Sequence, residues 1–510
     1  MKKSLVIHPF LFAIFPILAL YAHNMAELSF SETLVPLAVA LGFALLLLLL
    51  SWLVVRDCKK AGIIVSIFLI IFFADGHIYG VLREWGWVRP AIYLPVAWAM
   101  LFVGCVYLIM RTHRSLHNLT TILNVVAATL VAFCAVSIGV YESDRPSYDV
   151  QGGAPAVAVK PTGTPPDIYY IILDAYGRAD TFEDFYDFDN AEFIEYLSGR
   201  GFYVASQSRA NGVSTAHSLA TCLNMEFINY LSDEIGEDVT DLGPLHELVQ
   251  NHKVGQLLKS IGYKYIHVGS HWEMTRVNKY ADINFPGNPI REFPLLVYRT
   301  TLLGRIPAIA DKLGFVSDDR LMHWKCALYQ FEKLAEIPDM KDHIREPLFV
   351  FAHVVVPHCP HVFNQDGSFL TAEEEAKRGN PENYINQLMY CNEQVKTLIE
   401  QMLSKYSTSD TYPVIILQGD HGPSSAAWSD YHYALSDEDR TRLNMRILNA
   451  YYLPGGGNEL LYESITPVNT FRLVFDFYFE TNYGLLSDRS YRSNYAHPYQ
   501  FEDVTDILAE

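Results

Sequence analysis

The sequence predicts an N-terminal bundle of about five transmembrane helices, followed by an α/β domain whose central sheet is largely parallel and flanked by helices. Three observations lead to this prediction. Residues 1–140 are dominated by Leu, Ile, Val, Phe and Ala, residues 141–166 are rich in Pro, Gly and small residues, and runs typical of buried strands alternate with helical runs afterwards. We therefore expect a transmembrane domain at 1–140, a linker at 141–166 and a second domain at 167–510.

A helix that spans a bilayer needs roughly 20 mostly apolar residues. About five runs meet this criterion, namely Leu5–Tyr21, Leu34–Val55, Ala61–Leu82, Ala91–Met110 and Leu119–Val140. The first run follows Lys2 and Lys3 and also has the form of a signal peptide, but no small-residue cleavage site follows it.

The short loops predict the orientation, because Lys and Arg gather on the cytoplasmic side. The segments "RDCKK" after the second run and "RTHRS" after the fourth are basic, whereas "NMAELSFSE" after the first has no Lys or Arg. Arg83 and Arg89 in the third loop weaken this pattern without reversing it. We expect a multi-pass protein of the bacterial inner membrane with its second domain on the periplasmic side, whether or not the first run is cleaved.

The chain has a formal net charge of −19 at pH 7, and no Lys/Arg-rich run offsets it. This acidity argues against nucleic-acid binding. The expected state is a monomer.

The second domain contains several β-rich apolar runs and two clear helical patterns. The strands are expected at Ile168–Leu173, Tyr263–Gly269, Pro347–Val356, Tyr412–Gly419 and Asn449–Gly455, and the helices at Ala191–Gly201 and Tyr384–Leu403. Ligands of open α/β sheets bind where parallel strands end. Polar residues follow four of these strands at that point: Asp174, the sequence Ser270-His271-Trp272, the motif "PHCPH" with His358 and His361, and the pair Asp420-His421.

These side chains have the chemistry of a metal centre. Asp174, Asp420 and His421 offer carboxylate and imidazole ligands, which suit zinc or manganese. A hydroxyl from "STAHSLATC" (Ser214–Cys222) would complete four ligands and serve as a nucleophile. An Asp after a strand is also a common helix N-cap, but the joint placement of these groups favours a divalent metal cofactor.

The chain resembles the alkaline phosphatase/sulfatase superfamily in four segments. In chain order they are "PDIYYIILDAYGRAD", "STAHSLATC", "PHCPH" and "QGDHGP". The chain is most similar to its membrane-anchored branch, which contains lipid A phosphoethanolamine transferases and lipoteichoic acid synthases. The resemblance covers essentially the whole chain and implies a sulfatase-like second domain.

The resemblance implies Thr215 as nucleophile and metal ligand, because the transferases carry threonine in a T-A-(aromatic)-S-hydrophobic-P-C pattern. Ser214 and Ser218 are the alternatives. In this chain histidine replaces the aromatic residue, the proline is missing and one extra residue precedes Cys222. Sulfatases need Cys or Ser in C/S-x-P/A-x-R, and the segment from Ser218 to Cys222 lacks the arginine, which disfavours a sulfatase.

The resemblance also implies substrate contacts. His358 corresponds to a histidine that contacts the transferred phosphate, and it is also a candidate ligand of a second metal. His271 and Trp272 correspond to a head-group site, with His267 as the alternative. His361 and His432 complete the predicted substrate-binding set.

The implied activity is transfer of a phospholipid head group, phosphoethanolamine or phosphoglycerol, to a glycan or glycolipid through a phospho-threonine. A hydrolase acting on phosphodiesters or sulfate esters and a non-catalytic membrane scaffold are the alternatives. Two features suggest contact with the lipid donor: Asp75 and His77 near the outer end of the third span, and the apolar-basic stretch Phe293–Leu313.

Four cysteines lie in the second domain, where disulfides can persist. They are Cys222, Cys326, Cys359 and Cys391. Four cysteines allow three pairings, and the sequence does not choose among them. The transferases' cysteine pairing near the nucleophile is doubtful here, because Asn211 and Gly212 occupy the upstream region.

Overall fold

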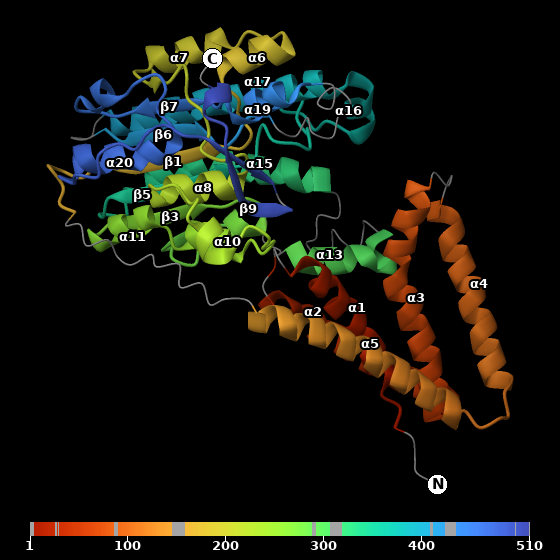
Figure 1. Cartoon of the computed structure of the whole chain (residues 1–510). Helices are drawn as coiled ribbons and strands as arrows, with labels where there is room; N and C mark the ends of the chain where they lie inside the picture. Colours follow the sequence, from red (N-terminus) through yellow and green to blue (C-terminus); the bar gives the residue numbers. More distant parts are fainter. Residues whose placement is uncertain are drawn as a thin grey trace. The chain divides into compact units, whose positions relative to one another are not determined.

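A computed structural model describes residues 5–25, 28, 30–85, 90–144, 159–287, 292–305, 319–407, 412–423, 435–494 and 496–508. The chain divides into two compact units (Figure 1): Met1–Ser147 with Ile290–Ser317, and Tyr148–Pro289 with Asp318–Glu510. The segment 290–317 therefore clusters with the N-terminal unit, whereas the sequence boundaries assign it to the second domain.

The N-terminal unit is helical. Its elements are α1 (His8–Asn24), η1 (Phe30–Thr33), α2 (Leu34–Val55), α3 (Cys58–Glu84), α4 (Pro90–Arg111), α5 (His117–Asp144), α13 (Glu292–Thr300) and η2 (Leu302–Arg305). Helix α5 continues through Tyr141–Asp144, the first residues of the expected linker.

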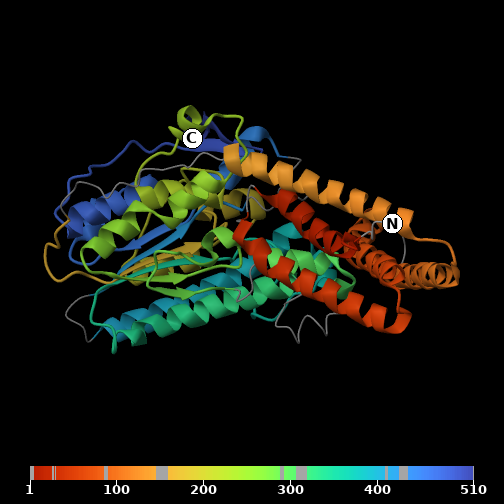
Figure 2. The same cartoon turned by 90° about the horizontal axis from the view of Figure 1, so that it is seen from below.

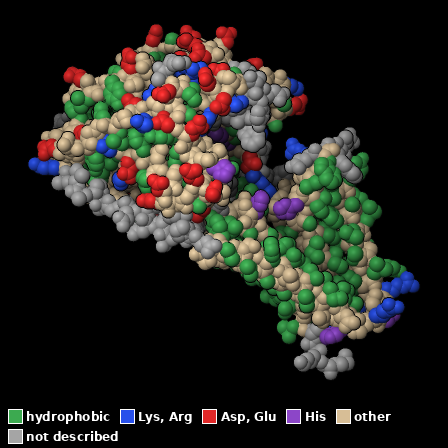
Figure 3. All heavy atoms as spheres, viewed as in Figure 1, with side chains coloured by type: hydrophobic (Ala, Val, Ile, Leu, Met, Phe, Trp, Pro, Cys, Tyr) green, Lys and Arg blue, Asp and Glu red, His purple; other side chains and the backbone are tan. Residues whose placement is uncertain are grey.

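Among the described residues, four helical segments are long and apolar enough to cross a membrane: Phe30–Val55, Cys58–Arg83, Tyr93–Arg111 and His117–Ser143. They correspond to the second to fifth expected spans. The first expected span coincides with α1, which has 17 residues and is shorter than these four. Hydrophobic side chains cover much of this unit in Figure 3. The prediction of a membrane-anchored chain with an N-terminal helical bundle is confirmed.

Helix α13 packs against the helices of the N-terminal half of this unit. Phe293 is fully buried, and its ring lies edge-to-face with that of Tyr21 at 6.3 Å. A side chain at Gly76 of α3 would place Cβ 2.4 Å from the carbonyl oxygen of Arg299. Only glycine permits this close approach of α13 to α3.

The C-terminal unit is built on a seven-stranded sheet with the order β2-β7-β6-β1-β5-β3-β4. The strands are β1 (Ile168–Leu173), β2 (Tyr203–Val204), β3 (Lys264–Val268), β4 (Ile283–Phe285), β5 (Leu348–Val354), β6 (Val414–Gly419) and β7 (Asn449–Tyr452), and a separate hairpin joins β8 (Tyr491–Asn494) to β9 (His497–Asp503). The pairings β6-β1-β5-β3-β4 are parallel, whereas β7 pairs antiparallel with both β6 and β2. The expected largely parallel sheet is confirmed.

Helices flank both faces of this sheet (Figure 2). The described helices of this unit are α6 (Ala179–Tyr186), α7 (Ala191–Gly199), α8 (Thr215–Asn224), α9 (Leu231–Ile235), α10 (Gly243–Gln250), α11 (Lys253–Ser260), α12 (Glu273–Arg276), α15 (Asp319–Met340), α16 (Ala372–Arg378), α17 (Asn380–Tyr406), α19 (Asp437–Met445) and α20 (Pro467–Tyr478), with the short helices η4 (Gly457–Leu460) and η5 (Asp506–Leu508).

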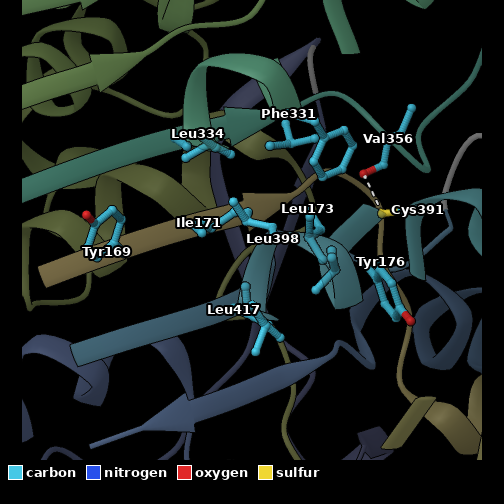
Figure 4. Packing of buried hydrophobic residues seen from close by; sticks show 14 of the residues in the cluster. Tyr169, Ile171, Leu173, Tyr176, Phe331, Leu334, Val356, Cys391, Leu398 and Leu417 are labelled. Carbon is cyan, nitrogen blue, oxygen red and sulfur yellow. Dashed lines mark hydrogen bonds between the residues drawn. The ribbon is translucent and has the colours of Figure 1, made fainter. Parts of the chain in front are cut away.

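The central strand β1 is buried on both faces, which explains its uninterrupted apolar sequence. Tyr169, Ile171 and Leu173 pack in one core with α15 and α17 (Figure 4). The alternate residues of β1 pack in a second core with α8, α10, α11 and α20. Since β1 lies between β5 and β6, the residue that follows β1 lies between the carboxyl ends of these two parallel strands.

Candidate active site

Three acidic and imidazole side chains meet at the carboxyl ends of the central strands. Leu173 of β1 pairs with Val354 of β5 and with Gly419 of β6. Asp174 and Asp420 are the next residues along β1 and β6, and His353 is the penultimate residue of β5. The register of the parallel strands thus brings these side chains to one edge of the sheet, as predicted for Asp174 and Asp420.

The atoms lie close enough to share a metal ion. Oδ2 of Asp174 is 3.3 Å from Nε2 of His353, and Oδ1 is 3.5 Å from Nε2 of His421. The same His421 nitrogen lies 3.5 Å from Oδ2 of Asp420. Two groups have their ligand atoms within 4.8 Å of one another: Asp174, His358 and His421, and Asp174, His353 and Asp420. Asp174 belongs to both groups.

Hydrogen bonds orient the imidazoles. Nδ1 of His421 lies 2.7 Å from the Gly422 carbonyl, and Nδ1 of His358 lies 2.6 Å from the Cys359 carbonyl. A carbonyl only accepts, so each Nδ1 carries a proton. Nε2 is therefore the ring nitrogen left to face a metal or an anion.

A hydrogen bond to Nδ1 also orients His353, but here the partner is a hydroxyl. Its Nδ1 is 2.7 Å from the Thr275 hydroxyl, which lies 2.7 Å from the Ser270 hydroxyl. Partners of this kind fix the ring orientation of metal-binding histidines. The hydroxyl chain points Nε2 of His353 toward Asp174.

Asp420 is fixed by the backbone. Its Oδ1 accepts hydrogen bonds from the amides of Ala175 and His421, at 3.0 and 2.9 Å. Ala175 has a φ of 61°, a left-handed conformation that costs energy for a residue with a Cβ. In the same "DHG" motif, a Cβ on Gly422 would lie 2.0 Å from the Leu443 carbonyl oxygen. The backbone is thus shaped to hold the Asp420 carboxylate.

Three of the converging atoms are buried without a hydrogen-bond partner in the described part of the chain: Oδ1 of Asp174, Oδ2 of Asp420 and Nε2 of His353. Leaving buried polar atoms unpaired is unfavourable. A divalent cation would satisfy all three, so the residues present fit a metal.

The electrostatics agree with this assignment. Burial alone raises the pKa of Asp174, but the neighbouring imidazoles of His358, His353 and His421 outweigh it and hold the pKa well below its usual range. Burial lowers the pKa of His358, but the Asp174 charge and the Cys359 hydrogen bond outweigh it and raise the pKa to about 10. The cluster thus favours an ionised carboxylate beside positive charge.

The three candidate hydroxyls differ in their partners. Ser218 donates to the Gly212 carbonyl at 2.9 Å, and the Ser214 hydroxyl is 2.7 Å from Nδ1 of His217. Thr215, the first residue of α8, is 7% exposed, and its hydroxyl makes no hydrogen bond with any described residue. Thr215 is therefore the hydroxyl left available, although its part in the metal centre stays a prediction.

His217 occupies the position where the resemblance predicts an aromatic residue, and its ring packs against another aromatic ring. Its ring lies edge-to-face with Phe501 at 5.8 Å, and Nε2 is 2.7 Å from the Pro498 carbonyl. Burial lowers the pKa of His217 to about 4, so the ring is neutral. This side chain packs α8 against the β9 strand.

All seven cysteines are free. The Tyr170 hydroxyl donates to Sγ of Cys222 at 3.1 Å, and burial raises the pKa of this thiol to about 12. Cys222 therefore anchors α8 by packing and hydrogen bonding, without a disulfide.

The predicted substrate-binding residues are placed differently from one another. The ring of His271 lies 5.2 Å from that of His323, and the ring of Trp272 lies 6.3 Å from that of His353, so both border the centre. His361 instead has Nδ1 3.6 Å from Oε1 of Glu375 and a ring contact with Tyr384. The alternative, His267, has Nε2 2.7 Å from the Thr275 carbonyl. The remaining residue of that set, His432, lies outside the described residues.

Two histidines at this site were not singled out from the sequence. His353 lies inside an apolar strand and looked like a core residue, although it belongs to the three-histidine run "HVVVPHCPH". His323 lies on α15, where no motif marks it. Only the fold brings them beside Asp174 and His271.

Comparison with solved structures finds similar folds at low identity. The C-terminal periplasmic domain of EcEptC from Escherichia coli in complex with Zn is 11% identical with a TM-score of 0.44, over 68% of this chain and 95% of that chain. The integral membrane lipooligosaccharide phosphoethanolamine transferase A from Neisseria meningitidis is 13% identical with a TM-score of 0.37, over 92% and 94%. These likenesses do not by themselves assign a function to this chain. Among curated proteins, none matches it.

The sequence itself matches one family. The model of the family described as Sulfatase matches residues 166–473, more than half of the chain. The match contains Asp174, Thr215 and the Asp420-His421 pair, and it confirms the resemblance to the alkaline phosphatase/sulfatase superfamily. The chain belongs to the sulfatase family.

Proposed function

We propose that this protein is a membrane-anchored, metal-dependent transferase that moves a phospholipid head group to a hydroxyl of a cell-envelope glycan or glycolipid. The group is phosphoethanolamine or phosphoglycerol. The observation that carries the proposal is the Thr215 hydroxyl, which makes no hydrogen bond with any described residue while those of Ser214 and Ser218 are engaged. It begins α8 in a sulfatase-family domain that is joined to membrane helices.

Asp174, Asp420, His421 and Thr215 would hold the metal, with His353 as a further ligand. Zinc is the metal that this oxygen and imidazole set favours, and manganese is the alternative. When bound, a divalent metal lowers the pKa of a hydroxyl and withdraws charge from a phosphoryl oxygen.

In the first step, Oγ1 of Thr215 bonds to the phosphorus of the donor lipid and the bond from phosphorus to the diacylglycerol oxygen breaks. The Thr215 proton is lost, and the diacylglycerol oxygen gains a proton. Thr215 is the first residue of α8, so the positive end of the helix dipole would favour the negative charge of the new phosphodiester. His358, positively charged at neutral pH because its pKa is raised to about 10, would bind a phosphate oxygen.

In the second step, the acceptor hydroxyl bonds to phosphorus and gives up its proton. The bond from phosphorus to Oγ1 breaks, and Thr215 regains a proton. Water in place of the acceptor would make the same site a phosphodiesterase. A sulfatase is disfavoured, because the Ser218 hydroxyl is buried and donates to Gly212, and Cys222 stands where the signature has arginine.

The loops support a periplasmic site for the C-terminal unit. Arg56 lies between α2 and α3, and Lys59 and Lys60 lie in the first turn of α3. Arg111 ends α4, and Arg114 lies between α4 and α5. If these basic loops are cytoplasmic, α5 leads to the other side of the membrane. The C-terminal unit then lies on the periplasmic side whether or not α1 crosses the membrane. We place the protein in the bacterial inner membrane, as a monomer.

The test is to incubate the full-length protein with phospholipid vesicles, follow diacylglycerol release and identify the adduct on the Thr215 peptide by mass spectrometry. Thr215→Val preserves the side-chain shape and should abolish both signals. Ser214→Ala, one residue away, should keep both. Cleavage of sulfate esters without diacylglycerol release, or an adduct on Ser214 or Ser218, would contradict the proposal.

A further inference from the structure

The N-terminal unit contains an apolar pocket of about 320 Å³. It is lined by side chains of α1, α2, α3, α13, η2 and the residue between the last two, among them Val35, Val39, Phe72, Phe73, Tyr298, Thr301 and Leu303. A cavity of this size is large enough for part of a small ligand.

The few polar groups in the lining are already satisfied. The Tyr298 hydroxyl donates to the Leu303 carbonyl, and the Thr301 hydroxyl donates to the Tyr298 carbonyl, each at 2.7 Å. A site without free polar groups holds water poorly. The pocket therefore suits a hydrocarbon occupant.

The pocket is open where the membrane lipids would be. Val35 and Val39 on α2 are 68% and 66% exposed, and α2 lies in a segment long and apolar enough to cross a bilayer. An acyl chain can therefore enter sideways from the bilayer. Because lipid tails are as apolar as the lining, packing rather than the hydrophobic effect must favour the pocket over bulk lipid.

A polar cluster lies beside the pocket on two of the same elements. Asp75 follows Phe72 and Phe73 on α3, and Arg305 follows Leu303 in η2. Oδ2 of Asp75 is 2.6 Å from Nε of Arg305, and Oδ1 accepts from the Trp98 indole at 2.9 Å. The guanidinium also lies 4.3 Å from the ring centre of Tyr79. Arg305 is thus held in one position.

The two terminal nitrogens of Arg305 have no hydrogen-bond partner among the described residues, although both atoms are buried. Buried donors without acceptors are unfavourable, and a guanidinium matches two oxygens of a phosphate. Polar and ionic groups at membrane depth commonly mark functional sites. The cluster therefore complements an anionic group attached to an apolar chain.

We propose that the pocket and Arg305 form a binding site for a membrane phospholipid, with one acyl chain in the pocket and the phosphate against Arg305. This rests on the proposed function only in naming the bound lipid as the donor. The site requires α13 and η2, which explains why this segment of the chain returns to the membrane helices.

The experiment uses the full chain in vesicles that contain phosphatidylethanolamine with a photoreactive acyl chain, followed by peptide mapping. Adducts should concentrate on the α2 and α13 residues that line the pocket. Val39→Trp fills the pocket mouth and should lower their yield about tenfold, which corresponds to about 1.4 kcal/mol. Leu46→Trp is the matched control, since Leu46 lies on α2, is 53% exposed and does not line the pocket.

A second pair of variants tests Arg305. Arg305→Gln combined with Asp75→Asn avoids an unpaired buried charge, and it should remove the preference for the phospholipid over diacylglycerol with the same photoreactive chain. Arg305→Lys keeps the charge and should retain most of that preference. Equal adduct yields in Val39→Trp and Leu46→Trp, or adducts spread evenly over all lipid-facing helices, would overturn the proposal.

Thr215→Val separates this inference from the proposed function. The variant should bind and crosslink the lipid like the wild type while releasing no diacylglycerol. Selective crosslinking without any transfer by the wild type would leave the lipid site standing and remove the transferase proposal. Transfer by the wild type without selective crosslinking would support the transferase proposal and overturn the lipid site.

Discussion

Each unit buries an aspartate, but the two aspartates have different kinds of partner. Asp174 faces imidazole nitrogens of His353 and His421, and a second carboxylate lies beside it. Asp75 faces the guanidinium of Arg305 and the indole N–H of Trp98. Imidazole and carboxylate offer lone pairs to a cation, whereas guanidinium and indole only donate hydrogen bonds. The first cluster is therefore suited to a metal and the second to an anion.

The strongest test of this contrast is Asp174→Asn. Asp174 belongs to both groups of potential ligands, so we expect loss of bound metal and at least about a 10³-fold loss of transfer, because metal catalysis supplies several kcal/mol. Metal analysis by mass spectrometry and diacylglycerol release are the measurements. Asp75→Asn is the control and should leave the metal content unchanged; equal metal loss in both variants would erase the distinction.

The next effect concerns stability of the membrane unit. Asp75→Asn leaves Arg305 without its ionic partner, and breaking a buried ion pair costs about 3–5 kcal/mol. We expect a marked fall in the thermal unfolding temperature of the full chain in detergent. The double variant with Arg305→Gln should recover much of it. A single variant as stable as the wild type would mean that water or lipid already screens the pair.

A smaller effect is expected from Thr275→Val. The change removes the hydroxyl that orients His353, and loss of such a partner typically weakens metal binding about 10–100-fold. Thr275→Ser keeps the hydroxyl and should restore affinity, as measured by competition with a chelator. If Val and Ser variants bind metal equally well, His353 is not a ligand.

The smallest effect is a pH dependence confined to the C-terminal unit. Burial lowers the pKa of His252 to about 3, while its Nδ1 accepts from the Gly255 amide at the start of α11. The unfolded chain binds a proton near pH 6.5 and the folded one does not, so stability from this group is full above pH 6.5 and is lost as pH falls toward 3. Between pH 7.5 and 5.5 the loss is about 1 kcal/mol.

His252→Asn keeps an acceptor for the Gly255 amide and should reduce this loss, as measured by denaturant unfolding at the two pH values. Other buried imidazoles of the same unit, among them His217 and His267, contribute in the same direction. An unchanged pH dependence in the variant would show that they dominate.

Much of the architecture could be predicted from the sequence. The long apolar runs can only be satisfied in a bilayer or a core, and the continuous strand Ile168–Leu173 can only lie inside a sheet covered on both faces. Asp174 and the Asp420-His421 pair were predicted because they follow such strands. His353 was not, because a histidine within a strand has the same local pattern whether it packs in the core or faces a site.

At the level of sequence, only the resemblance to the transferases chose among the hydroxyls of Ser214, Thr215 and Ser218. The fold supplies a physical reason for Thr215, because Gly212 and His217 occupy the other two. The fold also shows that the cysteines are free. The sequence could not show this, because no local pattern states which side chains become neighbours.

What the sequence determined by itself is therefore the kind of structure at each position: membrane helix, buried strand, and the polar residue that ends it. Those properties depend on local composition and spacing. Only the tertiary structure decided which of these residues meet, such as Asp174 with His353 and Asp75 with Arg305. Such meetings depend on strand register and helix packing between segments far apart along the chain, which no local pattern encodes.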